Sequence, residues 1–145
     1  MRGVSRNNIW ISRGLISLVL LINIQCALIF LSSPELYAPA FELGGVAGNA
    51  VIQGFGILFL MWNVPYFFAI LHPQKNRISL FEAVLMQMIG LIGESILFLG
   101  FPEGHSVIQA SIARFVIFDG IGLLILILSA WLTRLEKSSM FHGQV

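Results

Sequence analysis

Four apolar stretches, separated by short polar breaks, account for most of the sequence. They run approximately over residues 11–31, 46–71, 79–99 and 107–132. A membrane-spanning helix needs about 20 predominantly apolar residues, so each stretch is long enough to cross a bilayer. Only 10% of the residues are charged, whereas soluble domains carry about 25%. The sequence therefore predicts an all-α polytopic membrane protein, an antiparallel four-transmembrane-helix bundle that forms a single domain over residues 1–145.

The breaks between the stretches are rich in turn-forming residues and cover residues 32–34, 72–73 and 100–104. Two serines near these breaks, Ser79 and Ser106, are each followed three residues later by Glu82 or Gln109. This spacing is typical of a capping box, in which the serine and the acidic or amide side chain satisfy free backbone N–H groups. We expect short loops, and helices that start at the two serines.

The basic residues are distributed unevenly along the chain. Seven of the eight precede the first stretch, lie at its start, separate the second from the third, or follow the fourth: Arg2, Arg6, Arg13, Lys75, Arg77, Arg134 and Lys137. Because Lys and Arg concentrate on the cytoplasmic side, both termini are expected to be cytoplasmic in a plasma (inner) membrane. A cleaved signal peptide, with Ala38-Pro39-Ala40 as its site, is the alternative. The long apolar run over 14–31 and Pro39 argue against it.

Three charged residues, Glu94, Arg114 and Asp119, fall inside the third and fourth stretches. A charge at mid-helix costs about 2.5–3.5 kcal/mol to insert, so such residues usually face the bundle interior and have partners. Counted along the helices, Glu94 lies about 8 Å and Arg114 about 10 Å from the outer face. The two stretches are joined by a short loop, so we predict an ion pair between Glu94 and Arg114.

Amide side chains are expected at the same depth, and with the charges they form a candidate polar cluster. Its members are Glu94, Arg114, Asp119, Gln53, Gln87, Gln25 and Asn49, with Asn23 a little deeper. Gln87, Gly90 and Glu94 recur at i, i+3 and i+7, the spacing of one helix face. Gln87 is at the depth of Asp119. One arginine cannot neutralise two carboxylates, so Asp119 is protonated or the site holds water or a cation. The cluster is therefore a ligand-binding cavity or, alternatively, helix-packing glue.

The segment Asn63-Val64-Pro65 interrupts the second stretch. Proline donates no backbone hydrogen bond and frees a carbonyl one turn upstream, so a bend is expected there. Asn63 is the candidate to cover that loss. The other interpretation is a hinge, or an entrance to a cavity, at Asn63 and Pro65.

The four-stretch layout is similar to that of small four-helix bacterial membrane proteins of the DoxX-like kind. The glycine-rich "ELGGVAGNA" at 42–50 and the "RFVIFDG" at 114–120 contribute to this resemblance. The resemblance covers the topology of most of the chain, and neither segment is a specific signature. It implies a bacterial inner-membrane setting and an undefined role, and we carry over no catalytic residue from it.

Several function classes find no support in the sequence. Cys26 is the one cysteine, and the histidines, His72, His105 and His142, lie in connections or the tail, so neither a disulfide nor an intramembrane bis-histidine haem is expected. The net charge of +1 gives no reason to expect nucleic acid. Without a nucleophile–base pair or nucleotide motif, neither an enzyme nor a cofactor is indicated. We expect a membrane protein that binds a small amphipathic ligand, lipid or quinone, or else an accessory subunit of a larger membrane complex.

Overall fold

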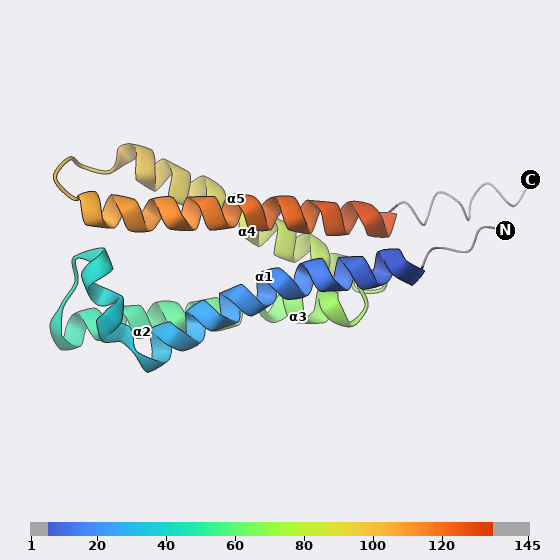
Figure 1. Ribbon diagram of the computed structural model, residues 1–145, viewed down its shortest axis with the longest axis horizontal. Helices are drawn as coiled ribbons and strands as arrows, with labels where there is room; N and C mark the ends of the chain where they lie inside the picture. The colour runs from blue at the N-terminus through green and yellow to red at the C-terminus, as the bar shows by residue number, and fades with distance from the viewer. Residues whose placement is uncertain (1–5, 135–145) are drawn as a thin grey trace, which may run out of the picture.

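The computed structural model describes residues 6–134, and all regular secondary structure within that range is helical. The elements, in chain order, are α1 (Arg6–Ser32), η1 (Pro34–Leu36), η2 (Ala38–Phe41), α2 (Gly45–Trp62), α3 (Val64–Leu71), α4 (Arg77–Gly100) and α5 (Ser106–Arg134) (Figure 1). The all-α prediction is thus confirmed for the described part of the chain. Arg2, Lys137 and His142, on which part of the sequence interpretation depends, lie outside it.

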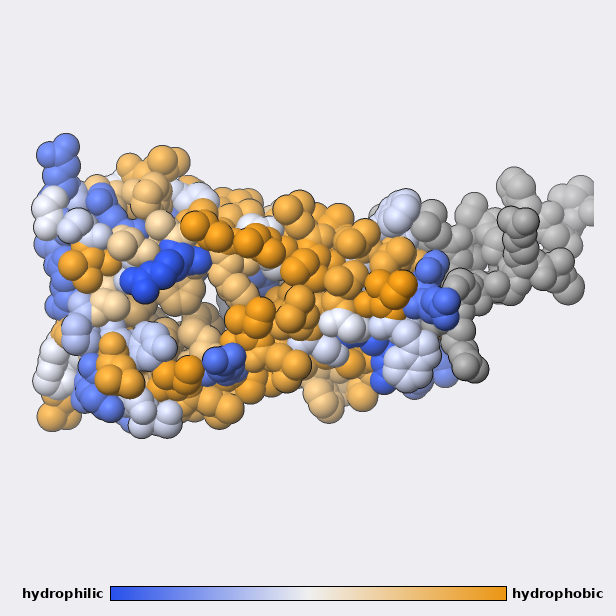
Figure 2. Space-filling model, viewed as in Figure 1, coloured by the Kyte–Doolittle hydropathy of each residue, from blue (hydrophilic) through white to orange (hydrophobic). Residues whose placement is uncertain are grey.

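Four helical segments are long and apolar enough to cross a membrane, as the sequence predicts. They are Asn7–Ser32, Gly45–Leu71, Arg77–Gly100 and Ser106–Thr133. Their outward-facing side chains are apolar: Leu124, for example, is 70% exposed. Figure 2 shows this surface as a broad hydrophobic zone over the middle of the molecule, with hydrophilic residues gathered toward its two ends. Such a surface suggests a multi-pass membrane protein, since soluble monomers rarely expose so large an apolar patch.

The connections between the helices gather at two ends of the molecule (Figure 1). One end, here called the loop end, holds η1, η2 and the 101–105 connection between α4 and α5. The opposite end holds the start of α1, the end of α5 and the 72–76 connection between α3 and α4. Helix α5 packs along α4 and α1, and α1 also packs along α2 and α3. All four long segments therefore face a common interior.

Two buried apolar clusters occupy this interior. One contains Ile16, Tyr66 and Leu126, and the partly buried Trp62 and Phe118 pack against it. The other, around Phe30 and Ile52, extends beneath the loop end. Its partly buried neighbours include Phe59 and Phe115. The aromatic rings at the edges of both clusters line one cavity.

A few polar contacts tie the helices together outside the apolar clusters. The hydroxyl oxygens of Ser12 in α1 and Ser129 in α5 are buried and 2.5 Å apart. At the loop end, His105 Nδ1 lies 2.6 Å from Glu42 Oε2, which connects the α4–α5 loop to the residues before α2. Ser111 also donates a hydrogen bond of 2.6 Å to the carbonyl of Ala40. Both ends of the helical assembly are therefore held by contacts between distant parts of the chain.

The start of α4 differs from the expectation. The helix begins at Arg77 with Asn76 as its N-cap, so Ser79 lies inside the first turn and the predicted capping box does not form. Asn76 instead donates a side-chain hydrogen bond of 2.7 Å to the carbonyl of Phe68. That bond joins the connection to the end of α3, and it fixes the helix start two residues early. Helix α5, by contrast, begins at Ser106, as the sequence predicts.

The second long segment is interrupted at Asn63, where α2 ends and α3 begins. The interruption falls two residues before Pro65, which has no backbone N–H to donate. The Asn63 side chain is buried, and its Nδ2 donates a hydrogen bond of 2.6 Å to the carbonyl of Phe59. The amide thus bonds to the last turn of α2, and not to the Met61 carbonyl, which is the one that Pro65 leaves without its usual donor. Whether this point acts as a hinge stays a prediction.

Replacing Asn63 by alanine is expected to lower the free energy of unfolding by about 1 kcal/mol. The change removes the bond to the Phe59 carbonyl at a buried position. Thermal unfolding in detergent measures the effect. Asn49→Ala, at a half-buried position in α2, is the matched control and should change stability by less than about 0.5 kcal/mol. Equal losses for the two variants would contradict a special role for Asn63.

Candidate functional site

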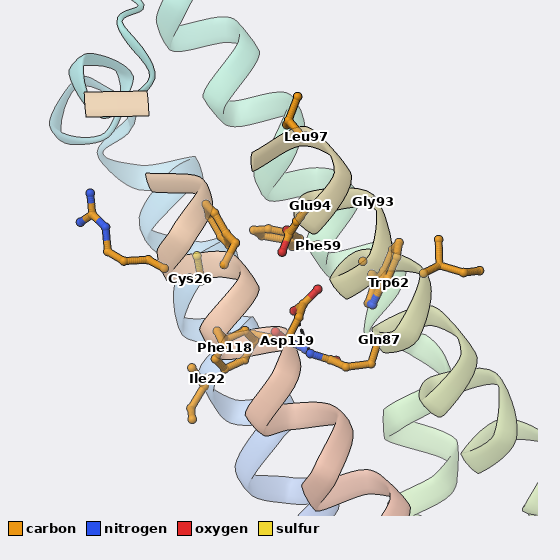
Figure 3. A pocket seen from close by; sticks show the side chains of 15 residues that line it. Ile22, Cys26, Phe59, Trp62, Gln87, Gly93, Glu94, Leu97, Phe118 and Asp119 are labelled. Carbon is orange, nitrogen blue, oxygen red and sulfur yellow. Dashed lines mark hydrogen bonds between the residues drawn. The ribbon is translucent and has the colours of Figure 1, made fainter. Parts of the chain in front are cut away.

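A cavity of about 510 Å³ lies between α1, α2, α4 and α5 (Figure 3). Its walls are mostly apolar, and four aromatic side chains contribute to them: Phe59, Trp62, Phe115 and Phe118. The volume falls within the range of about 300–1,000 Å³ that is usual for small-molecule sites. Because the aromatic rings come from the edges of both apolar clusters, the cavity is the gap that separates these clusters.

Two carboxylates face each other inside this cavity. Glu94 projects from α4 and Asp119 from α5, and Figure 3 shows their carboxyl groups pointing toward one another. Gln87, Gly90 and Glu94 all line the cavity, as expected from their i, i+3, i+7 spacing on one face of α4. The cavity therefore combines an apolar, aromatic wall with a small acidic patch.

A chain of hydrogen bonds holds one of the carboxylates in place. Gln87, which is 2% exposed, donates from Nε2 to Asp119 Oδ1 over 2.8 Å. The Tyr66 hydroxyl lies 2.5 Å from Gln87 Oε1, to which it donates, and 3.3 Å from the carbonyl of Ala83. These bonds link α3, α4 and α5 at the base of the cavity. Gln87 and Asp119 meet at the depth that the sequence predicts for both.

Tyr66 was not among the candidate site residues, although the sequence offers a signal for it. It follows Pro65 directly in an apolar stretch, and a tyrosine hydroxyl within such a stretch usually needs a hydrogen-bond partner. The partner is Gln87. Because the side chain of Tyr66 is fully buried, its role is to position Gln87 and, through it, Asp119.

Two glycines provide the space that this chain of bonds requires. A Cβ atom on Gly90 would collide with Asp119 Oδ2, and one on Gly122 would lie 2.7 Å from Gln87 Nε2. A larger residue at either position would therefore displace the Gln87–Asp119 pair. The Asp119 carboxylate is consequently fixed by a hydrogen bond on one oxygen and by close packing against Gly90 on the other.

Glu94 is in a different situation. Its Oε2 atom is buried and has no hydrogen-bond partner among the residues that the structure describes. A buried polar group without a partner is costly, because it has lost its hydration and gained nothing in exchange. The carboxyl of Glu94 thus faces the cavity and Asp119 with an unused hydrogen-bonding position.

The predicted ion pair between Glu94 and Arg114 is wrong. Arg114 is exposed, and its guanidinium donates to its own helix, from Nε to Ala110 O and from Nη2 to Ser111 Oγ, each over 3.2 Å. Within residues 7–133, the one ion pair is His105–Glu42. The reason is rotation about the helix axis: five residues separate Arg114 from Asp119, which turns their side chains about 140° apart. Depth alone could not reveal this, and Arg114 remains at the rim of the cavity.

Three of the predicted amides also lie away from the cavity. Gln25 is exposed, Asn49 is half-buried in α2, and Gln53 is exposed and donates to the carbonyl of Leu31 over 3.3 Å. Asn23 and Cys26 of α1, by contrast, line the cavity. Of the seven predicted cluster residues, Glu94, Arg114, Asp119 and Gln87 border one cavity. The break at Asn63 and Pro65 directly follows the cavity-lining Trp62.

Comparison with known proteins yields no relative: no protein-family model, no curated protein and no solved structure matches the chain. The geometry of the cavity is therefore the basis for the functional proposals below.

Proposed function

We propose that the chain is an antiparallel four-helix protein of the plasma (inner) membrane that binds a small amphipathic molecule in the cavity between its helices. The observation that carries this proposal is the unpartnered, buried Glu94 oxygen, which faces Asp119 inside an apolar cavity of about 510 Å³. Polar groups that serve only as packing glue bond to each other across helices. Glu94 does not, so its carboxyl is available to a ligand.

The walls of the cavity favour entry from the lipid. Ile89 and Leu97 on α4 line the cavity and are also 56% and 51% exposed on the apolar surface. A molecule with an apolar body could therefore move between the bilayer and the cavity without crossing water. Its polar group would then meet Glu94 and Asp119. This route suits an amphipathic ligand better than a fully hydrated one.

The charge distribution supports a definite orientation. The loop end carries Glu35, Glu42 and Glu103, while Lys75 and Arg77 occur at the opposite end. Because basic residues concentrate on the cytoplasmic side, the loop end is external and both termini are cytoplasmic. The same layout is that of the small DoxX-like bacterial membrane proteins, and kinship with them is part of this proposal.

Cysteine labelling tests the orientation directly. In a Cys26→Ser background, Lys75→Cys and Glu103→Cys place single thiols at exposed positions of opposite ends. A membrane-impermeant maleimide applied to intact cells should label position 103 and leave position 75 unlabelled until the membrane is opened. Labelling of position 75 from outside would show that the orientation is reversed.

Purification in native lipid, followed by mass spectrometry, tests ligand binding. The wild-type protein should carry a small molecule at a stoichiometry that falls in Glu94→Gln and Asp119→Asn. Glu103→Gln, which changes an exposed glutamate outside the cavity, is the control and should retain it. A protein that instead co-purifies with a partner subunit, with no small molecule, would favour an accessory role in a larger membrane complex.

A further inference from the structure

We infer that the ligand carries a positive charge: the cavity is shaped to bind a hydrophobic organic cation, such as a protonated or quaternary amine with an apolar body. This inference deepens the proposed function and depends on it. It narrows the amphipathic ligand from any lipid or quinone to one chemical class. Three features of the cavity support it: the charges around it, its engaged hydrogen-bond donors and its aromatic walls.

The charges around the cavity do not balance. Glu94 and Asp119 face one another, and two carboxylates that approach in a medium of low dielectric constant cannot both stay ionised without a positive charge nearby. Within the described part of the chain, Arg114 is the one basic side chain that lines the cavity, and its guanidinium bonds to Ala110 and Ser111 instead. The side chains that α1 and α2 contribute are neutral, among them Asn23, Cys26 and Trp62. The missing positive charge therefore comes from a proton or from the ligand.

The hydrogen-bond donors at the base of the cavity are already engaged. Gln87 donates to Asp119, and Tyr66 donates to Gln87. A quinone or an ester presents carbonyl oxygens, which need donors. Beside this engaged pair, the group left open to a ligand is a carboxylate oxygen, which accepts: within residues 6–134, Oε2 of Glu94 has no hydrogen-bond partner. An ammonium group, which donates or carries charge, complements these acceptors, whereas a carbonyl does not.

The aromatic walls complete the match. Phe59, Trp62, Phe115 and Phe118 surround the same space as the two carboxylates. The face of an aromatic ring attracts a cation, and indole does so most strongly. A desolvated cation–π contact contributes about 2 kcal/mol, equivalent to about 30-fold in affinity. A neutral ligand would leave the two facing carboxylates without a positive charge. An organic cation can pair with the carboxylates and also contact the aromatic rings.

A single-tryptophan protein provides the assay. Trp10 and Trp131 are 60% and 54% exposed on the surface of the helices. Replacing both by phenylalanine leaves Trp62, which lines the cavity, as the one fluorescent tryptophan. Three probes with four phenyl groups on one central atom differ in charge: tetraphenylphosphonium (positive), tetraphenylsilane (neutral) and tetraphenylborate (negative). Quenching of Trp62 fluorescence is titrated with each probe, in a nonionic detergent.

The cation should bind at least about 10-fold more tightly than the neutral probe, and the anion more weakly still. Glu94→Gln and Asp119→Asn in the same background should each reduce affinity for the cation by about 10-fold, while Glu103→Gln should not. Equal affinity for the three probes would overturn the cation inference and leave a ligand site without charge selection. The inference and the proposed function would both be overturned if no probe quenched Trp62 fluorescence and mass spectrometry of the protein purified in native lipid found no small molecule.

Discussion

Replacing Gln87 by leucine is expected to lower the free energy of unfolding by about 3 kcal/mol. The leucine fills the space but bonds to neither neighbour, so Asp119 Oδ1 loses its donor and the Tyr66 hydroxyl loses an acceptor. Leaving a buried polar group unsatisfied costs about 1–3 kcal/mol, more when it is charged, and here two groups are affected at once. Thermal unfolding in detergent, compared with the wild-type protein, measures the loss.

Two further variants separate the hydrogen bonds from side-chain volume. Gln25→Leu makes the same chemical change at an exposed position of α1 and should leave stability nearly unchanged. Tyr66→Phe should cost less in the Gln87→Leu background than alone, because its hydroxyl has already lost its partner. If Gln87→Leu behaves like Gln25→Leu, or if the effects at 66 and 87 simply add, the Tyr66–Gln87–Asp119 chain of bonds does not contribute as described.

The extent of the long helices could be predicted from the sequence because it depends on local properties. The length and apolar content of the stretches at 11–31 and 107–132 are visible in a short window of residues. The structure extends them to Asn7–Ser32 and Ser106–Thr133, a difference of four residues at the start of the first and of one residue at every other end. The start of α4 was harder to predict, because the bond from Asn76 to Phe68 joins two helices and leaves no mark within the Ser79–Glu82 motif.

The candidate site was predicted in part, and the limit is geometric. Counting residues gives the depth of a side chain, which brought Gln87 to the level of Asp119, where the structure has their hydrogen bond. Periodicity gives the shared face of Gln87, Gly90 and Glu94 within α4. Neither count gives the rotation of one helix relative to another. Arg114 matched Glu94 in depth, but its guanidinium bonds along α5 at the rim of the cavity and does not reach Glu94.

The roles of Tyr66 and of the glycines also depend on how the helices pack against each other. Whether a glycine allows a close approach depends on what lies opposite, and this is known only once the helices are packed. Gly90 admits the Asp119 carboxylate, whereas Gly93, three residues further along the same helix, has open space beside it. In the sequence, both are glycines of the same apolar stretch, and nothing there distinguishes one from the other. Their different environments make Gly93 a useful position for changing the cavity alone.

Gly93→Leu is expected to weaken ligand binding strongly without destabilising the protein. Gly93 lines the cavity, and a Cβ atom there would meet no atom within 4 Å, so the new side chain can enter the empty space without moving the backbone. Leucine is also favoured over glycine in the interior of a helix by about 0.8 kcal/mol. In the Trp62 reporter protein, affinity for tetraphenylphosphonium should fall by about 100-fold, a loss of about 2.7 kcal/mol in binding free energy.

Gly54→Leu is the matched control for this variant. Gly54 lies within α2, has no atom within 4 Å of an added Cβ, and does not line the cavity. It should therefore gain the same helix preference as Gly93→Leu while retaining wild-type affinity for tetraphenylphosphonium. Equal binding by the two variants would mean that the probe binds elsewhere. A loss of thermal stability in Gly93→Leu alone would mean that the space beside Gly93 is not open. A ligand site between the helices predicts that Gly93→Leu keeps its stability and loses affinity for the probe. If the polar cluster served only helix packing, the substitution would change stability and there would be no specific binding to lose.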